Sequence, residues 1–312
     1  MTAGRIDPEL ATAIARLEGD GWLPLWRDDV ADARRNYREL ALIRRGEAAE
    51  VGTVHDDVVS GPDADVAVRV YEPAGERRGV TVVWLHGGGW VLGDLDTADG
   101  AARRVCTHLE ATVVSVDYRL APEHPHPAPV TDAHTALRWA ATLRPSDRLV
   151  VGGDSAGGGL AAGAALLARD WGPRVDAQLL LYPGLDPARG FPSIVENAAG
   201  PFLTRADVDW FWDRYVPEPA LRDDPAVAPL RAAGEPGGLA DVAPAVVATA
   251  ELDPFRDETR AYAEALDAAG VPVRLLTGPT LVHGYFGLAA ASAAARAEGD
   301  RALDALAELL AT

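Results

Sequence analysis

The chain has 312 residues, of which 29 are basic and 47 acidic, so its formal net charge is −18. A chain of this length buries most of its unfolded surface without crosslinks, and its single cysteine, Cys106, excludes an internal disulfide framework. Duplex DNA and anionic membranes both require clustered cations, so we expect neither nucleic-acid nor membrane binding. No signal peptide and no apolar run of about 18 residues are visible, and we therefore expect a cytoplasmic protein.

The N-terminal segment predicts two helices. Apolar side chains recur at helical spacing after Asp7, and Asp7 followed by Pro8 is a favourable helix start. Trp22, Pro24 and Trp26 interrupt this pattern before a second helix at about residues 28–45.

From residue 54 onward, strands alternate with helices. Val66, Val68 and Val70 alternate with less apolar neighbours, as in a half-buried strand, whereas the apolar run Val80–Leu85 is typical of a strand covered on both faces. Further strands are predicted at Thr112–Asp117, Arg148–Val151, Ala177–Leu181, Ala245–Thr249 and Val273–Leu276, and helices at about 97–110, 129–143, 156–169, 256–269 and 288–310. This alternation predicts an α/β fold with a mainly parallel sheet, helices on both faces and an antiparallel edge.

A segment at about residues 183–216 interrupts the alternation. It is rich in proline and aromatic side chains, and we expect it to be irregular. Together with residues 1–45, it is a candidate for a lid over the open end of the sheet.

The segment Gly153–Gly157, after the strand Arg148–Val151, matches the motif G-x-S-x-G. In that motif the serine, here Ser155, lies on a strained turn between a strand and a helix, which holds its hydroxyl above the sheet. Glycines are needed on both sides because a Cβ would clash in so tight a turn.

A second glycine-rich motif, HGGGW at residues 86–90, directly follows the strand Val80–Leu85. Consecutive glycines allow main-chain N–H groups to approach a substrate oxygen without interference from side chains. A phosphate-binding loop is the alternative. The lysine that a P-loop requires is absent from this sequence, and no G-x-G-x-x-G opens a helix early in the sheet, so the alternative is disfavoured.

A serine nucleophile needs a base, and the base needs an orienting acid. In chains with this motif the order is Ser, acid, His, and His283 is the only histidine after Ser155. Asp253, just after the strand Ala245–Thr249, is the preferred acid. Nearby rivals are Glu251, Asp257 and Glu258, of which the last two are expected to cap the following helix or lie on its surface.

These residues together resemble the hormone-sensitive lipase family of α/β-hydrolases, which includes the bacterial family IV esterases. The resemblance covers about residues 60–290 and rests on HGGGW at 86–90, YRLAPE at 118–123, GDSAGG at 153–158, DPFRDE at 253–258 and HGY at 283–285. It implies an α/β-hydrolase fold with a helical cap. Residues 1–45 would form N-terminal cap helices, and residues 46–312 a catalytic domain with a cap insertion at about 183–216. Phe255 and Tyr285 replace the commoner Leu and Phe, and neither change removes a reacting group.

The resemblance also implies a serine carboxylesterase that acts on short- to medium-chain acyl esters and needs no cofactor. Carried over by position, Ser155 would be the nucleophile, His283 the base and Asp253 its orienter. The oxyanion hole would consist of the backbone N–H groups of Gly88, Gly89 and Ala156.

Supporting roles follow from the same resemblance. His86 would shape the glycine loop, while Arg119 and Glu123 would brace loops near the nucleophile. His124 and His126 flank Pro125, but no third ligand is implied, so we expect no metal there.

Other functions remain open at this point. An amidase or specialised deacetylase would use the same triad, whereas a non-catalytic binder of this fold would have lost a triad residue, and this chain has all three. The expected partner is a small-molecule ester, and pairing through an edge strand at Val273–Leu276 would give a homodimer by analogy with the family. Short acyl chains are favoured because bulky rings narrow a pocket mouth. The candidate rings are Trp22, Trp26, Trp90, Phe202, Trp210, Phe211, Trp212 and Tyr215.

Overall fold

The computed structural model describes residues 6–27, 29–44, 46–234 and 238–311. The ends of the second predicted helix, residues 28 and 45, therefore lie outside the described residues, as do residues 1–5 of the N-terminal cap range. Within the described residues, no helix is both long enough and apolar enough to cross a membrane.

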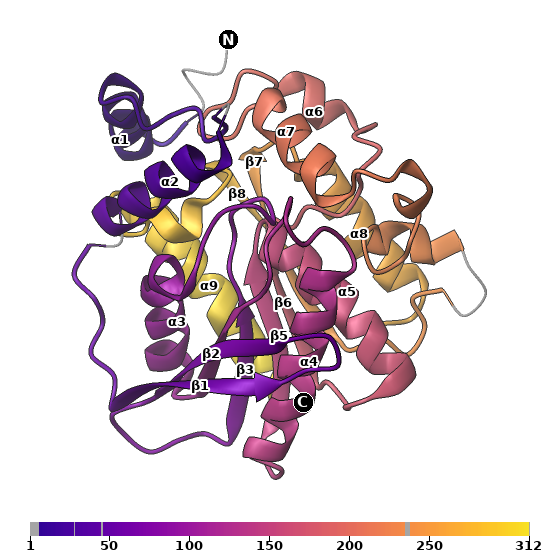
Figure 1. Ribbon diagram of the computed structural model, residues 1–312. Helices are drawn as coiled ribbons and strands as arrows, with labels where there is room; N and C mark the ends of the chain where they lie inside the picture. The colour runs from indigo at the N-terminus through magenta and orange to yellow at the C-terminus, as the bar shows by residue number, and fades with distance from the viewer. Residues whose placement is uncertain (1–5, 28, 45, 235–237, 312) are drawn as a thin grey trace.

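A single eight-stranded sheet forms the centre of the described chain (Figure 1). Its spatial order is β1-β2-β4-β3-β5-β6-β7-β8, in which β1 pairs antiparallel with β2, β2 pairs antiparallel with β4, and all later pairs are parallel. The strands are β1 (Thr53–Ser60), β2 (Asp65–Glu72), β3 (Val80–Leu85), β4 (Thr112–Asp117), β5 (Arg148–Asp154), β6 (Ala177–Leu181), β7 (Ala245–Leu252) and β8 (Val273–Val282). The predicted α/β class, parallel sheet and antiparallel edge are confirmed.

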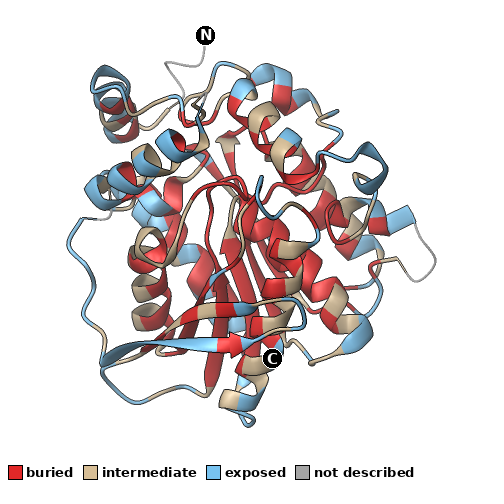
Figure 2. Ribbon diagram, viewed as in Figure 1, coloured by how far each residue is buried: buried red, intermediate tan, exposed pale blue. Residues whose placement is uncertain are grey.

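Helices cover both faces of the sheet. On one face lie α3 (Leu95–Leu109) and α9 (Ala293–Leu310), which contact each other; the other face carries α4 (Ala128–Leu143), α5 (Ala156–Trp171) and α8 (Arg256–Ala268). Burial on both faces explains why β3 is apolar at every position except Thr81, and why all six of its residues are buried (Figure 2).

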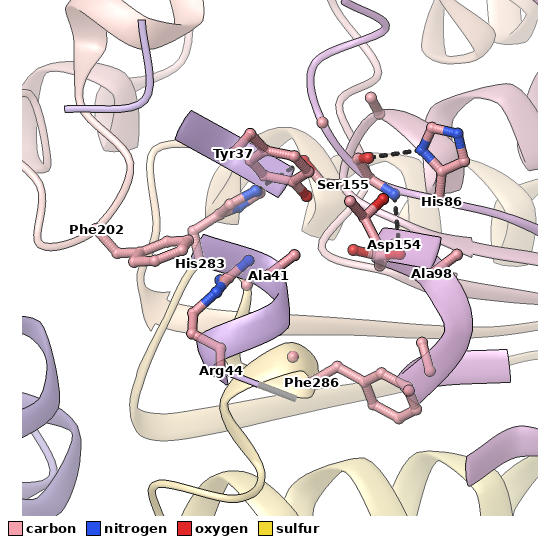
Figure 3. A pocket seen from close by; sticks show the side chains of 18 of the residues that line it. Tyr37, Ala41, Arg44, His86, Ala98, Asp154, Ser155, Phe202, His283 and Phe286 are labelled. Atoms are coloured by element: carbon pink, nitrogen blue, oxygen red, sulfur yellow. Dashed lines mark hydrogen bonds between the residues drawn. The ribbon is translucent and has the colours of Figure 1, made fainter. Parts of the chain in front are cut away.

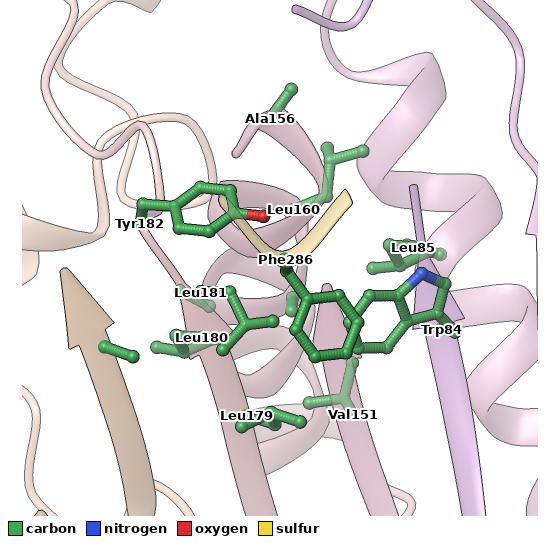
Figure 4. Close-up of a cluster of buried hydrophobic side chains, with 14 of the residues drawn as sticks. Trp84, Leu85, Val151, Ala156, Leu160, Leu179, Leu180, Leu181, Tyr182 and Phe286 are labelled. Atoms are coloured by element: carbon green, nitrogen blue, oxygen red, sulfur yellow. The ribbon is translucent and has the colours of Figure 1, made fainter. Parts of the chain in front are cut away.

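The core between β3, β5 and β6 packs large rings against branched aliphatic side chains (Figure 4). Trp84 of β3 lies 5.8 Å from the ring of Phe286, which belongs to the short 3₁₀ helix η3 (Tyr285–Leu288). This contact ties the segment after β8 to the middle of the sheet. Cys106 is a buried free thiol within α3, and burial raises its pKa to about 12, so it is a structural side chain.

Two segments lie above the carboxyl ends of the parallel strands (Figure 1). The first contains α1 (Pro8–Gly19) and α2 (Val30–Arg44), and the second, after β6, contains α6 (Pro192–Glu196) and α7 (Arg205–Tyr215). The short helices η1 (Pro219–Leu221) and η2 (Pro229–Gly234) follow before β7, and η2 contacts α5 and α8. The backbone N–H of Trp26 donates to Asp207 of α7 at 2.9 Å, so the two segments contact each other. This arrangement supports the interpretation of both segments as a cap.

The expectation that residues 183–216 are irregular is wrong, because α6 and α7 lie within them. A capping box starts α7: Thr204 accepts from the Asp207 N–H, and Asp207 accepts in return from the Thr204 N–H. Val208, Phe211 and Tyr215 then recur at helical spacing and are buried. The final helix also starts later than predicted, at Ala293, after the Ser292 N-cap.

Candidate active site

Ser155 lies on the turn between β5 and α5, as the motif predicts. Its φ is 55° and ψ is −120°, a left-handed conformation that is strained for a residue with a Cβ. The turn is close to β3, since a Cβ added to Gly157 would lie 1.9 Å from the Leu85 carbonyl oxygen, and one added to Gly153 would lie 2.4 Å from it. Only glycine fits at these two positions, and the serine hydroxyl is thereby held at the carboxyl end of the sheet.

The structure brings Ser155, His283 and Asp253 together. His283 Nε2 lies 2.8 Å from Ser155 Oγ, and His283 Nδ1 lies 2.9 Å from Asp253 Oδ2. Both His283 and Asp253 are buried, and the ring of Phe255 lies edge-on to the imidazole at 5.4 Å. The last strand is longer than predicted: β8 continues past Leu276 to Val282 and leads directly to His283.

The orientation of Asp253 is fixed by one hydrogen bond within its own turn and one from a distant side chain. Its Oδ1 accepts from the Phe255 N–H at 2.8 Å, and its carbonyl accepts from the Asn197 side chain at 3.2 Å. One carboxylate oxygen therefore remains directed at the His283 ring.

The rival carboxylates face other partners. Glu251 pairs with Arg260 at 2.9 Å, and Asp257 Oδ2 accepts from the Ser193 N–H at 2.9 Å. Glu258 is fully buried and accepts from the Leu185 N–H at 2.7 Å, and burial raises its pKa well above the usual range. The expected surface or capping role is thus wrong for Glu258, which binds the backbone of the segment just after β6.

The glycine loop after β3 adopts a backbone that requires glycine. Gly88 has φ 127° and Gly89 has φ 60°. A Cβ on Gly88 would lie 2.3 Å from the Leu92 carbonyl oxygen, and one on Gly89 would lie 2.1 Å from the Phe211 ring. The bare backbone of Gly88 and Gly89 lines the pocket together with Ala156, the first residue of α5. These are the three residues that the family resemblance implies as oxyanion donors.

His86 contacts this loop and holds it in place (Figure 3). Its Nδ1 lies 2.8 Å from the Gly87 carbonyl oxygen, its ring stacks on Tyr118 at 4.3 Å, and the Tyr118 hydroxyl donates to the His86 carbonyl at 2.7 Å. Burial lowers the pKa of His86, which keeps the imidazole neutral.

Asp154, which the sequence reasoning passed over, is a further functional candidate. Its Oδ1 accepts from the Gly87 N–H at 3.1 Å, so the residue before Ser155 holds the glycine loop in place (Figure 3). Burial raises the pKa of Asp154 to about 6. The available signal was its fixed place inside G-x-S-x-G, directly before the serine.

A cavity of about 530 Å³ opens at Ser155 and His283. This volume lies within the usual range for small-molecule sites. Of the rings that the sequence proposed for the lid and the glycine loop, Trp90, Phe202, Phe211 and Trp212 line it, whereas Trp22, Trp26, Trp210 and Tyr215 do not. Tyr215 instead stacks on Trp90 at 4.5 Å and supports the wall from outside.

The remaining motif residues have structural partners. Arg119 pairs with buried Asp132 at 2.8 Å, and Glu123 pairs with Arg34 of α2 at 2.6 Å, which connects the cap to the loop after β4. His126 Nε2 lies 3.0 Å from Asp224. In the described ranges, no group of three or more His, Cys, Asp or Glu side chains is arranged to hold a metal ion.

Comparison with known proteins shows which family the chain belongs to. A family profile described as the alpha/beta hydrolase fold matches residues 82–287. The chain belongs to this family. The carboxylesterase NlhH of Mycobacterium tuberculosis is 47% identical over 250 residues, 78% of each chain, and the esterase LipI of the same organism is 42% identical over 89% of this chain and 88% of its own. The resemblance to hormone-sensitive-lipase-type esterases is therefore confirmed.

The fold likeness extends to solved structures. An alpha/beta hydrolase enzyme from the metagenome of Lake Arreo, Spain, superimposes with a TM-score of 0.91 at 33% identity and covers 99% of this chain and 100% of its own. The predicted α/β-hydrolase fold is thus confirmed over nearly the whole chain.

Proposed function

We propose that this carboxylesterase cleaves short- to medium-chain acyl esters through an acyl-enzyme intermediate on Ser155. The observation that carries the proposal is the continuous hydrogen-bonded chain from Ser155 Oγ through His283 to Asp253, at 2.8 and 2.9 Å, in the wall of the cavity.

In the first half-reaction, Ser155 Oγ attacks the ester carbonyl carbon while His283 Nε2 accepts the hydroxyl proton. The negative charge moves to the carbonyl oxygen, which accepts hydrogen bonds from the N–H groups of Gly88, Gly89 and Ala156. Asp253 holds the proton on His283 Nδ1 and stabilises the imidazolium that forms. The tetrahedral intermediate collapses, and His283 protonates the departing alkoxide.

In the second half-reaction, water replaces the alcohol. His283 takes a proton from this water, whose oxygen attacks the acyl carbon, and then returns the proton to Ser155 Oγ as the acid leaves. The same donors bind the second oxyanion. Every proton is thereby returned, so the enzyme ends the cycle in its starting state.

The preference for short chains is supported by the cap. Trp90, Phe202, Phe211 and Trp212 reduce the width of the cavity with rigid rings. The net charge of −18 also disfavours docking on anionic lipid interfaces.

The decisive experiment is Ser155→Ala, assayed with 4-nitrophenyl butyrate. We expect a loss of more than about 10³-fold in kcat, because the covalent route disappears while the fold remains. The matched control is Ser193→Ala, which removes a buried hydroxyl that donates to the Pro254 carbonyl rather than to His283. If Ser155→Ala retains a tenth of the wild-type rate, the proposal is wrong. A matched ester and amide pair then separates the esterase from the amidase or deacetylase alternative.

A further inference from the structure

One side chain in the cavity has no role in the reaction described above. Arg44 ends α2, lines the cavity with Ser155 and His283, and directs its guanidinium into the group of residues around them (Figure 3). The guanidinium carbon lies 5.1 Å from the ring centre of Phe202 and 5.9 Å from that of Tyr37. Two aromatic faces therefore hold this cation at a fixed place in the wall.

Arg44 contacts Tyr37 but, unlike the other described arginines of its helix, it has no carboxylate partner. Arg34 pairs with Glu123, and Arg38 pairs with Asp94 and Asp96. Across the residues that the structure describes, no carboxylate lies within the 4.0 Å of an ion pair with Arg44, and its Nε is buried without a hydrogen-bond partner.

The acidic side chains around the cavity do not fill this gap. Asp300 pairs with Arg104 at 2.8 Å, and Asp154 accepts from the Gly87 N–H. Glu47 lies on the cavity edge and is exposed to solvent. The charge on Arg44 acts on Asp154 only at a distance, where it opposes the effect of burial on the pKa of that carboxyl.

Such an arrangement has a cost that a ligand would remove. An arginine stays protonated at every physiological pH, and a partly buried guanidinium without a carboxylate partner loses hydration without gaining an ion pair. Its planar fork matches a carboxylate, which accepts two parallel N–H bonds. A neutral ester leaves this fork unfilled.

We propose that Arg44 binds a carboxylate on the substrate, so that the preferred esters carry a free carboxylate near the scissile bond. This inference rests on the proposed esterase function and names the substrate class of the same site. The class includes half-esters of short dicarboxylic acids, with the charge on the acyl side, and acyl esters of short hydroxy acids, with the charge on the alcohol side.

The test uses two matched pairs of substrates. Ethyl hydrogen glutarate is compared with ethyl pentanoate, and butanoyloxyacetate with ethyl butanoate, in a pH-stat at pH 8. For the wild-type protein we expect kcat/KM to favour the anionic member of one pair by about tenfold or more, and that pair identifies the side of the ester that faces Arg44.

Variants separate Arg44 from general charge effects. Arg44→Met should lower the anionic-to-neutral ratio of kcat/KM by about 10- to 100-fold, the range expected for a lost charged hydrogen bond. Arg44→Lys should give an intermediate ratio, because it keeps the charge without the planar fork. The control is Arg35→Met, which removes one charge from the exposed side of the same helix and should leave the ratio unchanged.

Three outcomes overturn the inference. In the first, the wild-type protein favours neither anionic ester. In the second, Arg44→Met has the same anionic-to-neutral ratio of kcat/KM as the wild-type protein. In the third, Arg35→Met lowers this ratio as much as Arg44→Met does. Hydrolysis of any of the four esters separates the two proposals, because its absence from all four contradicts the esterase function itself. In that case, calorimetric titration of the Ser155→Ala protein with ethyl hydrogen glutarate decides the inference, since binding must be lost when Arg44→Met is added.

Discussion

The glycine loop offers a quantitative test of how the cap and the proposed oxyanion hole depend on each other. In Gly89→Ala, the new Cβ would lie 2.1 to 2.6 Å from three atoms of the Phe211 ring. Carbon atoms pack at about 3.5–4.0 Å, so the loop or the ring must move by more than about 1 Å. The φ of 60° adds about 1–2 kcal/mol of backbone strain for alanine.

A displacement of this size should impair the chemical step. Misplacement by about 1 Å costs on the order of 10²-fold, and loss of one oxyanion donor costs about 10²–10³-fold in kcat. We therefore expect Gly89→Ala to lower kcat for 4-nitrophenyl butyrate by about 10²–10³-fold. Adding Phe211→Ala removes the ring that the new Cβ would contact, so the double variant should have a kcat at least about tenfold higher than that of Gly89→Ala.

The control is Gly190→Ala, whose added Cβ would meet nothing within 4 Å and which should keep the wild-type rate. Thermal melts establish that each variant is folded. A Gly89→Ala protein with more than a tenth of the wild-type kcat, or a double variant no faster than Gly89→Ala, would refute the reasoning.

Three further predictions concern the acid, the carboxyl beside the serine and the acyl chain. Asp253→Asn should lower kcat by about 10⁴-fold, whereas Glu251→Gln and Asp257→Asn should each lower kcat by less than about tenfold. The three variants are assayed side by side, and a larger loss at Glu251 or Asp257 would assign the orienting acid to that residue instead.

The folded state holds a proton on Asp154 up to about pH 6. The contribution of Asp154 to the free energy of unfolding therefore falls by at most about 3 kcal/mol as the pH rises from 4 to 7. Urea unfolding between pH 4 and 7 should show this decline in the wild-type protein and not in Asp154→Asn. The same pH dependence of the unfolding free energy in both proteins would contradict this prediction. Finally, kcat/KM over esters of two to sixteen carbons should peak at roughly two to eight carbons, and a maximum at twelve or more, or a jump when an emulsion forms, would indicate a lipase.

The sequence alone determined the features that depend on neighbours along the chain. The apolar run of β3, the tight turn at Ser155 and the glycines of residues 87–89 each reflect a local requirement, either burial on both faces or space for a close backbone. Chain order was enough to select His283, because no other histidine follows the serine. These signals predicted the sheet, the fold family and the three side chains that the structure brings together.

Only the tertiary structure decided what lies around those side chains. Glu258 was expected on a helix surface, yet the cap insertion buries it against Leu185, a residue 73 positions earlier in the chain. Arg44 and Phe202 are far apart in sequence, and their contact in the cavity depends on how the two cap segments meet. Helical periodicity indicates which face of α2 is apolar, but it contains no information about which distant carboxylate, ring or cavity each polar side chain will face. That is set by packing between elements, and it is why the candidate carboxylate-binding residue was visible only after folding.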